Sequence, residues 1–172
     1  LTDFYKALSA EVNHRQNRDD PRDFEPIVVI LVGLQRLRDL RKSDDFSFGS
    51  FGADAEPDLA TRFTEVLRDG PTVNIFHILW CDGWNNLSRT LDRSALREFD
   101  QLALMQMSVN DSTQFIDSPA AGRLGRNRAL FCQLEQGVIE KFRPYAPVDP
   151  ALAQRIASAY HHSHPSPHAS PK

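Results

Sequence analysis

The sequence predicts a mixed α/β domain with a mostly parallel sheet, flanking helices and a C-terminal hairpin. An unbroken apolar run, "IVVILV" at 27–32, has the composition of a strand buried on both faces, and "TVNIFHILWC" at 72–81 predicts a second buried strand. Helical periodicity lies between them, and "RALFCQL" and "VIEKFRPY" enclose a Gly-containing turn at 135–137, as in a β-hairpin. Strands that alternate with helices are typical of a parallel sheet covered by helices.

The first half of the chain alternates between helix and strand signals. Apolar residues at helical spacing predict an N-terminal helix: Leu1, Phe4, Tyr5, Leu8 and Val12. After the first strand, a leucine at every third position between arginines predicts an amphipathic helix over 34–41 with a basic outer side. A loop at 42–56 follows, and the next helix begins at Pro57 and ends at Gly70.

Short polar residues predict where the later helices begin. Asp92 or Ser94 caps a short helix that contains Leu96 and Phe99. Asp111 or Ser112 caps a further helical turn, and Ser118 followed by Pro119 opens another. The Asp and Ser side chains among these place an oxygen near the unpaired N–H groups of a first turn.

The third strand is expected at 102–107, with the sequence "LALMQM". Asp149 followed by Pro150 opens the last helix, and 161–172 reads as a disordered tail of His, Pro and Ser. The predicted domain therefore spans 1–160, and because it begins inside a helical pattern we expect it to continue a longer protein.

Composition limits the kinds of partner. With 20 Lys plus Arg against 23 Asp plus Glu, the net charge is -3, so any contact with nucleic acid has to be local. Cys81 and Cys132 lie singly in apolar runs, which is typical of reduced thiols in a cytoplasmic protein and unlike a metal site. No apolar run approaches the roughly 20 residues that a membrane-spanning helix needs.

The ends of the predicted strands are the first candidates for a functional site. In parallel α/β sheets, ligands bind at the carboxyl ends of the strands. Those ends bring Val32 and Gly33, Asp82, and the polar segment 108–112 into consideration.

The segment "MSVNDSTQFIDSPAAGRLGRNRALF", at 107–131, resembles the FtsK/SpoIIIE family of DNA-pumping ATPases. The family pattern has a strand, an Asp-Ser pair, "ILD" (here "FID"), a Pro-Ala segment, a Leu-Gly and a strand ending in "LF". Upstream, "IVVILVGLQRL" is similar to the family's Walker B strand, and "RDGPTVNIFHILWCD" to its sensor strand. The resemblance covers residues 1 to about 160 in the same order.

The resemblance implies a RecA-like P-loop NTPase core that assembles as a homo-oligomer, a hexamer in the family. Family members bind ATP with Mg²⁺ between subunits and move double-stranded DNA. In such enzymes a Gly-rich loop cradles the phosphates and a Walker B acid helps to hold the magnesium ion.

This chain departs from the family at its catalytic positions. It contains no G-x-x-x-x-G-K-[ST] loop, and Val32 and Gly33 stand where the family has its Walker B acids. Asp82 stands at the sensor position, and Gln101 where the family has an arginine. We therefore expect a weak or inactive nucleotide site that binds neither ATP nor magnesium tightly.

Each candidate residue also has a structural interpretation. Asp82 is compatible with a strand-exit turn as well as with a sensor, and the arginines between 36 and 41 with a solvated helix face. Arg123, Arg126 and Arg128 could contact phosphate groups of DNA or of a nucleotide, or form a polar turn after a helix. The histidines of the tail suggest adventitious metal binding at most, and His77 a packed side chain.

Two classes of function remain open. The chain is either the C-terminal part of an FtsK-like translocase subunit with a degenerate nucleotide site, or a non-catalytic RecA-like interaction and assembly module.

Overall fold

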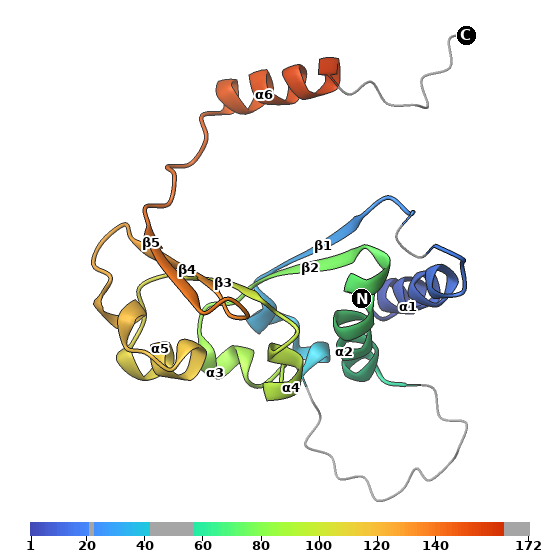
Figure 1. Cartoon of the computed structure of the whole chain (residues 1–172), viewed down its shortest axis with the longest axis horizontal. Coiled ribbons are helices and arrows are strands. Elements are labelled where there is room, and N and C mark those ends of the chain that lie inside the picture. Colours follow the sequence, from blue (N-terminus) through green and yellow to red (C-terminus); the bar gives the residue numbers. More distant parts are fainter. Residues whose placement is uncertain (21–22, 42–56, 164–172) are drawn as a thin grey trace, which may run out of the picture.

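The computed structural model describes residues 1–20, 23–41 and 57–163 of the chain. The strands form two small sheets (Figure 1). β1 (Ile27–Val32) and β2 (Ile75–Trp80) pair in parallel along their whole length. β3 (Gln101–Leu104), β4 (Ala129–Gln133) and β5 (Val138–Phe142) form an antiparallel sheet in this order.

The helices of the described residues cover one face of the parallel sheet and one side of the antiparallel sheet, except for α6, which stands apart (Figure 1). The α-helices are α1 (Thr2–Gln16), α2 (Leu59–Asp69), α3 (Trp84–Leu87), α4 (Arg93–Leu96), α5 (Val109–Ile116) and α6 (Pro150–Ser163). The 3-10 turns are η1 (Leu34–Arg36), η2 (Arg38–Leu40), η3 (Gly70–Val73) and η4 (Ala120–Arg123). None of the helices in the described ranges is long and apolar enough to cross a membrane.

The prediction of one mostly parallel sheet is wrong. Among the described strands only β1 and β2 run parallel, whereas the third predicted strand forms β3 and pairs antiparallel with β4. A short apolar run does not encode its direction, because direction depends on the strand with which it pairs. The chain is therefore mixed α/β with one parallel and one antiparallel sheet, and its assignment to a RecA-like core stays a prediction.

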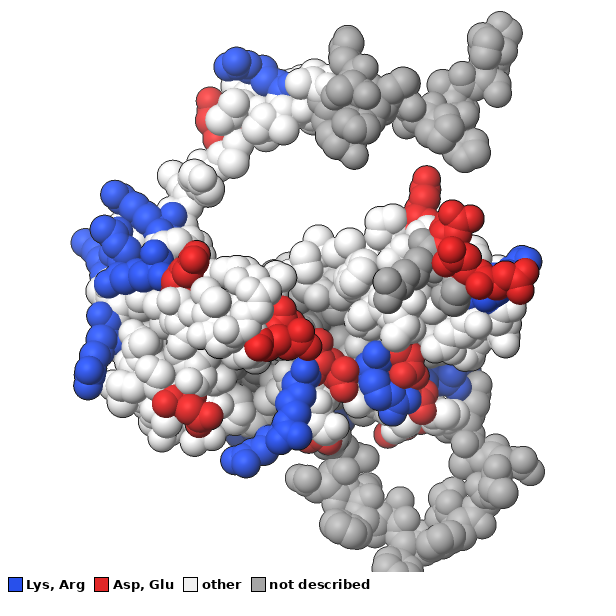
Figure 2. Space-filling model, in the orientation of Figure 1, with Lys and Arg blue, Asp and Glu red and all other residues white. Residues whose placement is uncertain are grey.

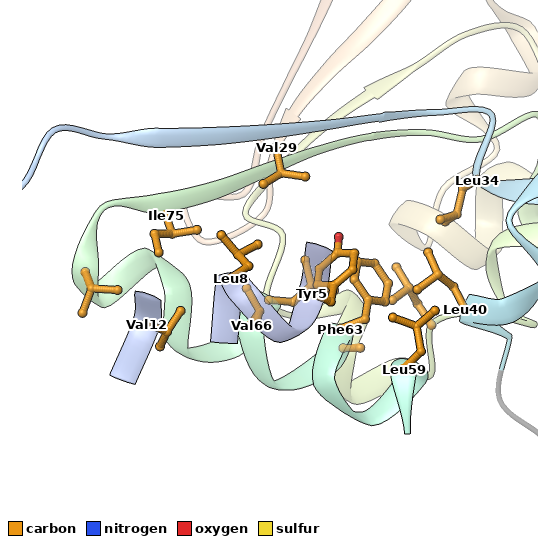
Figure 3. Packing of buried hydrophobic residues seen from close by; sticks show 14 of the residues in the cluster. Tyr5, Leu8, Val12, Val29, Leu34, Leu40, Leu59, Phe63, Val66 and Ile75 are labelled. Atoms are coloured by element: carbon orange, nitrogen blue, oxygen red, sulfur yellow. The ribbon is translucent and has the colours of Figure 1, made fainter. Parts of the chain in front are cut away.

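The main core lies between the parallel sheet and the two helices α1 and α2 (Figure 3). Tyr5 of α1 and Phe63 of α2 are both fully buried and meet edge to face, with ring centroids 5.3 Å apart. Val29 and Ile75 reach this core from the sheet. Rings and β-branched side chains packed in this way supply the largest part of folding stability.

His77 extends from the covered face of β2 into this core. Its ring is stacked on Tyr5 at 6.1 Å and meets Phe63 edge to face at the same distance, which confirms the prediction of a packed side chain. Burial lowers the pKa of His77 to about 4 and raises the pKa of the Tyr5 hydroxyl. The imidazole is therefore neutral at pH 7.

The opposite face of the parallel sheet, which we call the outer face, is open. Every side chain that the two strands place on this face is apolar: Val28, Ile30 and Val32 from β1, and Phe76, Ile78 and Trp80 from β2. All six are between 41% and 72% exposed. The prediction that these strands are buried on both faces is thus wrong for this structure, because helices cover one face only.

A buried arginine joins α1 to the beginnings of both parallel strands. Arg15 is 5% exposed and donates to the Glu11 carboxylate at 2.7 Å. It also donates to the backbone carbonyls of Glu25 at 3.0 Å and Val73 at 3.1 Å, and its guanidinium lies over the Phe24 ring at 4.9 Å. These contacts offset the cost of burying the charge.

The antiparallel sheet has a smaller core against α5 and η4. Its buried members are Leu104, Ala121, Leu124, Leu130 and Cys132. Trp84 of α3 and Phe115 of α5 meet edge to face at 5.1 Å, and Phe115 packs against both clusters. This aromatic pair connects the two halves of the molecule.

The local predictions divide into those that held and those that did not. Helix α2 and the β4–β5 hairpin are confirmed, but α2 begins at Leu59 and not at the predicted Pro57, because Asp58 caps it by accepting from the Thr61 N–H at 2.8 Å. The predicted amphipathic helix over 34–41 is wrong: the segment forms η1 and η2, separated by the non-helical Leu37 (φ -86°, ψ 75°). The predicted loop at 42–56 lies outside the described residues.

The predicted caps show the same mixture. Asp92 accepts from the Ala95 N–H at 2.8 Å and caps α4, as predicted. The cap of α5 is Ser108, which accepts from the Asp111 N–H at 3.0 Å, so the prediction of Asp111 or Ser112 is wrong. Ser112 is instead fully buried, and its hydroxyl donates a hydrogen bond to the Ser118 carbonyl.

The C-terminal helix begins where the sequence predicts. Asp149 accepts from the Ala151 N–H at 3.2 Å at the start of α6. The helix continues to Ser163, so the tail predicted at 161–172 starts too early. Residues 164–172 lie outside the described part of the chain.

Candidate functional site

The carboxyl end of β1 forms a turn at the position that resembles a Walker B tip. Val32 is 72% exposed, and the Gly33 N–H donates to the Trp80 carbonyl at 3.1 Å. Gly33 has φ 80°, a left-handed conformation that glycine adopts without strain. Neither residue carries an oxygen on its side chain, so the pair could not ligate magnesium through side chains.

Asp82 lies at the carboxyl end of β2 and bonds locally. Its Oδ1 accepts from the Asn86 side-chain amide at 2.9 Å, and the Cys81 thiol lies 3.7 Å from the same oxygen. These contacts are those of a strand-exit turn that leads into α3, and a sensor role for Asp82 stays a prediction. The described residues contain no group of three or more His, Cys, Asp or Glu placed to hold a metal ion.

A more favourable site for a ligand is a hollow of about 790 Å³ at one end of the antiparallel sheet. Three arginines line it, Arg126, Arg128 and Arg143, together with Gln106 and Tyr145. Among the described residues that line the hollow there is no Asp or Glu. Figure 2 shows Lys and Arg side chains gathered at this end of the molecule, where β5 leads toward α6. We call it the arginine hollow.

The loop that carries Arg126 and Arg128 is held by Gln106. The Gln106 amide donates to the Gly122 carbonyl at 2.9 Å, and its carbonyl oxygen accepts from the Gly125 N–H at 2.8 Å. Gly125 has φ 75°, which turns the chain sharply before the first arginine. The loop is therefore fixed by hydrogen bonds before any ligand arrives.

Ser112 fixes the segment that precedes this loop. Its hydroxyl donates to the Ser118 carbonyl at 2.5 Å and accepts from the Ala121 N–H at 3.0 Å. This joins α5 to η4 inside the smaller core, where Ser112 is fully buried. The Asp-Ser pair that resembled a family motif thus contributes a structural bond through its serine.

The hairpin brings the third arginine to the hollow. Ala129 of β4 pairs with Phe142 of β5, which places Arg128 and Arg143 beside each other just beyond the last pair. Sequence reasoning identified Arg126 and Arg128 and missed Arg143. The register of the predicted hairpin could have identified Arg143, because the turn at 135–137 determines which residues of the two strands face each other.

Arg123 does not belong to the hollow. It ends η4 with an exposed side chain and is absent from the described lining residues. The structure therefore separates the three predicted phosphate contacts into a pair within the hollow and one outside it.

The arrangement is suited to an anion. Each guanidinium is cationic at neutral pH and offers a planar fork of N–H donors that matches phosphate. Arg128 is half-buried and is oriented by a bond from its guanidinium to the Asn127 carbonyl at 3.0 Å. Tyr145, fully exposed at the rim, presents an aromatic face beside the positive charges.

A second hollow, of about 530 Å³, lies between α4 and α5. Its lining includes Arg93, Arg97 and Asp117 along with Trp84 and Phe115. Because opposite charges occur together there, it has less preference for an anion than the arginine hollow has.

The comparisons with known proteins leave the site to be interpreted from its geometry. Searches against protein families, curated proteins and solved structures find no match for this chain.

Proposed function

We propose that this chain is part of an FtsK/SpoIIIE-like DNA translocase subunit, that it contacts the phosphates of double-stranded DNA, and that it does not itself hydrolyse ATP. The observation that carries the proposal is the arginine hollow. Arg126, Arg128 and Arg143 line it, and no acid occurs among its described lining residues. Positive charge gathered at one end of a chain of net charge -3 is the local contact that phosphate binding requires.

The absence of hydrolysis follows from the residues at the end of β1. Phosphoryl transfer in P-loop enzymes needs a lysine on the phosphates and a carboxylate that helps to hold magnesium. Val32 and Gly33 supply no carboxylate, and the sequence has no phosphate loop. Any hydrolysis in a homo-oligomeric assembly, a hexamer by the resemblance, would have to use residues other than these.

An interaction and assembly module without a motor role is the second candidate. The observation that favours it is the outer face of the parallel sheet, with six exposed apolar residues. Exposed apolar patches of this kind mark surfaces that other protein segments cover.

DNA binding distinguishes the two candidates. Fluorescence anisotropy with a labelled duplex, at about 50 mM salt, would compare the wild type with Arg126→Ala/Arg128→Ala/Arg143→Ala. We expect the triple variant to bind roughly tenfold or more weakly and to lower the slope of log K against log salt by about 2 to 3. The matched control, Arg18→Ala/Arg38→Ala/Arg89→Ala, removes three exposed arginines outside the hollow and should retain most of the affinity.

Equal loss in both triple variants would show that binding depends on total charge and not on the hollow. No binding by the wild type would favour the interaction module. Magnesium-dependent ATP hydrolysis by the purified chain, lost in Asp82→Ala, would contradict the second half of the proposal.

A further inference from the structure

The outer face of the parallel sheet is a continuous apolar surface. The parallel register puts Val28 beside Phe76, Ile30 beside Ile78 and Val32 beside Trp80, so the three pairs form two adjacent rows. Exposure increases along β1 from 50% at Val28 to 72% at Val32. A sheet whose second face is solvated normally alternates apolar and polar residues along each strand, and these two strands do not.

The chain also contains an apolar helical stripe that lacks a covering surface in this structure. Every residue of α6 whose exposure is described is exposed, including Leu152 at 43% and Ile156 at 57%. These two residues lie four positions apart and therefore share one side of the helix. A helix of 14 residues is only marginally stable in water without tertiary packing, so a contact that buries this stripe would stabilise α6.

The position of α6 in the chain and in the fold makes contact between its apolar stripe and the outer face feasible. In Figure 1, α1 and α2 lie on one side of the β1–β2 sheet, and α6 stands apart from the body on the other side. The tether from β5 to α6 comprises residues 143–149 and includes two prolines, Pro144 and Pro147. Seven residues span at most about 25 Å when extended.

We propose that α6 docks on the outer face of the parallel sheet of its own chain, with Leu152 and Ile156 against Ile30, Ile78 and Trp80. Helices on both faces of a parallel sheet are the usual solution for strands that are apolar on both sides. A short tether keeps the local concentration of α6 near the millimolar range, which favours its own chain over a second copy at ordinary protein concentrations.

The composition of α6 fits this contact. Ala159 and Ala153 lie beside the stripe on its two edges, so the helix can approach the flat sheet closely there, and Arg155 lies beyond Ala159 with a side chain long enough to reach solvent. Gln154 and Ser158 lie on the opposite side of the helix, about 200° and 240° around the axis from Leu152, and would remain toward solvent. The helix therefore has one side for the sheet and one for water.

Trp80 reports docking directly, because it is 54% exposed on the outer face. Replacing the other tryptophan, Trp84→Phe, leaves Trp80 as the only tryptophan, and all variants are made in this background. Leu152→Asp/Ile156→Asp removes the stripe, and Gln154→Asp/Ser158→Asp adds the same two charges to the opposite side of the helix.

We expect the stripe variant to shift Trp80 emission to the red and to raise its quenching by acrylamide roughly twofold, since the indole moves from an apolar contact into water. The control variant should match the parent. Ile30→Thr, which keeps a β-branched side chain in the strand, should shift emission in the same direction as the stripe variant. This face variant keeps the test meaningful if charges disturb α6 itself.

Two results would overturn the proposal. If the stripe variant and its control give the same emission and quenching as the parent, α6 does not cover the outer face. If the difference appears only as protein concentration rises, together with dimers in sedimentation, the outer face is covered by a second copy.

Discussion

Around the parallel sheet, fifteen buried apolar residues form one cluster with α1 and α2, whereas the cluster against the antiparallel sheet contains five. The half of the molecule around the parallel sheet, which we call the packed half, is thus held by apolar packing. The half around the antiparallel sheet, which we call the second half, depends more on specific hydrogen bonds, from Gln106 and Ser112, that fix a loop. The candidate ligand site lies in the second half, since hydrogen bonds can hold charged side chains at a surface where apolar packing would bury them. We therefore expect that substitutions in the two regions can change stability and binding separately.

The largest effect is expected in the packed half. Phe63→Ala removes a fully buried ring that contacts Tyr5 and His77, and should lower the free energy of unfolding by about 3–5 kcal/mol. Phe4→Ala, at a ring that is 47% exposed on the same helix as Tyr5, should cost about 1 kcal/mol or less. Denaturant titration measures both, and equal costs would show that the cluster does not carry the stability of this half.

The next effect tests the polar contact inside the packed half. Arg15→Met keeps the length of the side chain but leaves the carbonyls of Glu25 and Val73 without their donor. We expect a loss of about 2–3 kcal/mol, because the Val73 carbonyl is buried and the Glu25 carbonyl partly buried, and acceptors left there without a partner are costly. Arg18→Met, at an exposed position one turn away, should cost about 0.5 kcal/mol or less. A neutral Arg15→Met would mean that apolar packing alone joins α1 to the strands.

A third prediction uses pH. The folded pKa of His77 is lowered by burial to about 4, below its ordinary value of 6.5. As the pH falls, the unfolded chain therefore takes up a proton at His77 before the folded chain does. The contribution of the neutral His77 to the free energy of unfolding is thus fully present above pH 6.5 and is lost as the pH falls toward 4. Allowing for solvent screening of a half-buried ring, the loss is about 1–2 kcal/mol. His77→Phe should remove this part of the pH dependence, measured as the difference between variant and wild type from pH 7 to pH 4.5. Parallel curves would contradict it.

The smallest effect on stability is expected in the second half, at Gln106. Gln106→Ala removes the bonds to Gly122 and Gly125 at an exposed side chain, and should cost about 1 kcal/mol. If the arginine hollow binds DNA as proposed, affinity should fall several-fold, because Arg126 and Arg128 lose their fixed loop. Gln114→Ala, an exposed glutamine on α5, is the matched control. Unchanged affinity in Gln106→Ala would show that the loop needs no prior ordering.

Local signals predicted local structure well. The apolar stripe of α2, the Asp92 cap and the hairpin turn each depend on residues within one element, and all are confirmed. The covering of the strands and the direction of β3 depend on partners far away in the chain, and these predictions failed. The prediction of an α-helix after Gly33 was wrong for a different reason. Leucines at every third residue fit a 3-10 turn as well as an α-helix.

The candidate site was predicted in part. Arg126 and Arg128 are neighbours in sequence, so a basic loop was visible from the residues alone. Arg143 joins them through strand pairing across the hairpin, and Gln106 holds the loop from nineteen residues before Gly125. Neither relation leaves a periodic signal in the sequence.

The tether between β5 and α6 contributes to the arginine hollow and also determines where α6 can reach. Its first residues, Arg143 to Pro147, line the arginine hollow, and its last residues lead into the helix. If both proposals hold, a polyanion in the hollow and α6 on the sheet would each select the conformations of this segment that suit them. Thermodynamic linkage then requires that the two events change each other's equilibrium by the same factor, in whichever direction. The segment would couple the two halves mechanically, so that a ligand in the arginine hollow would change the fraction of molecules in which α6 is docked.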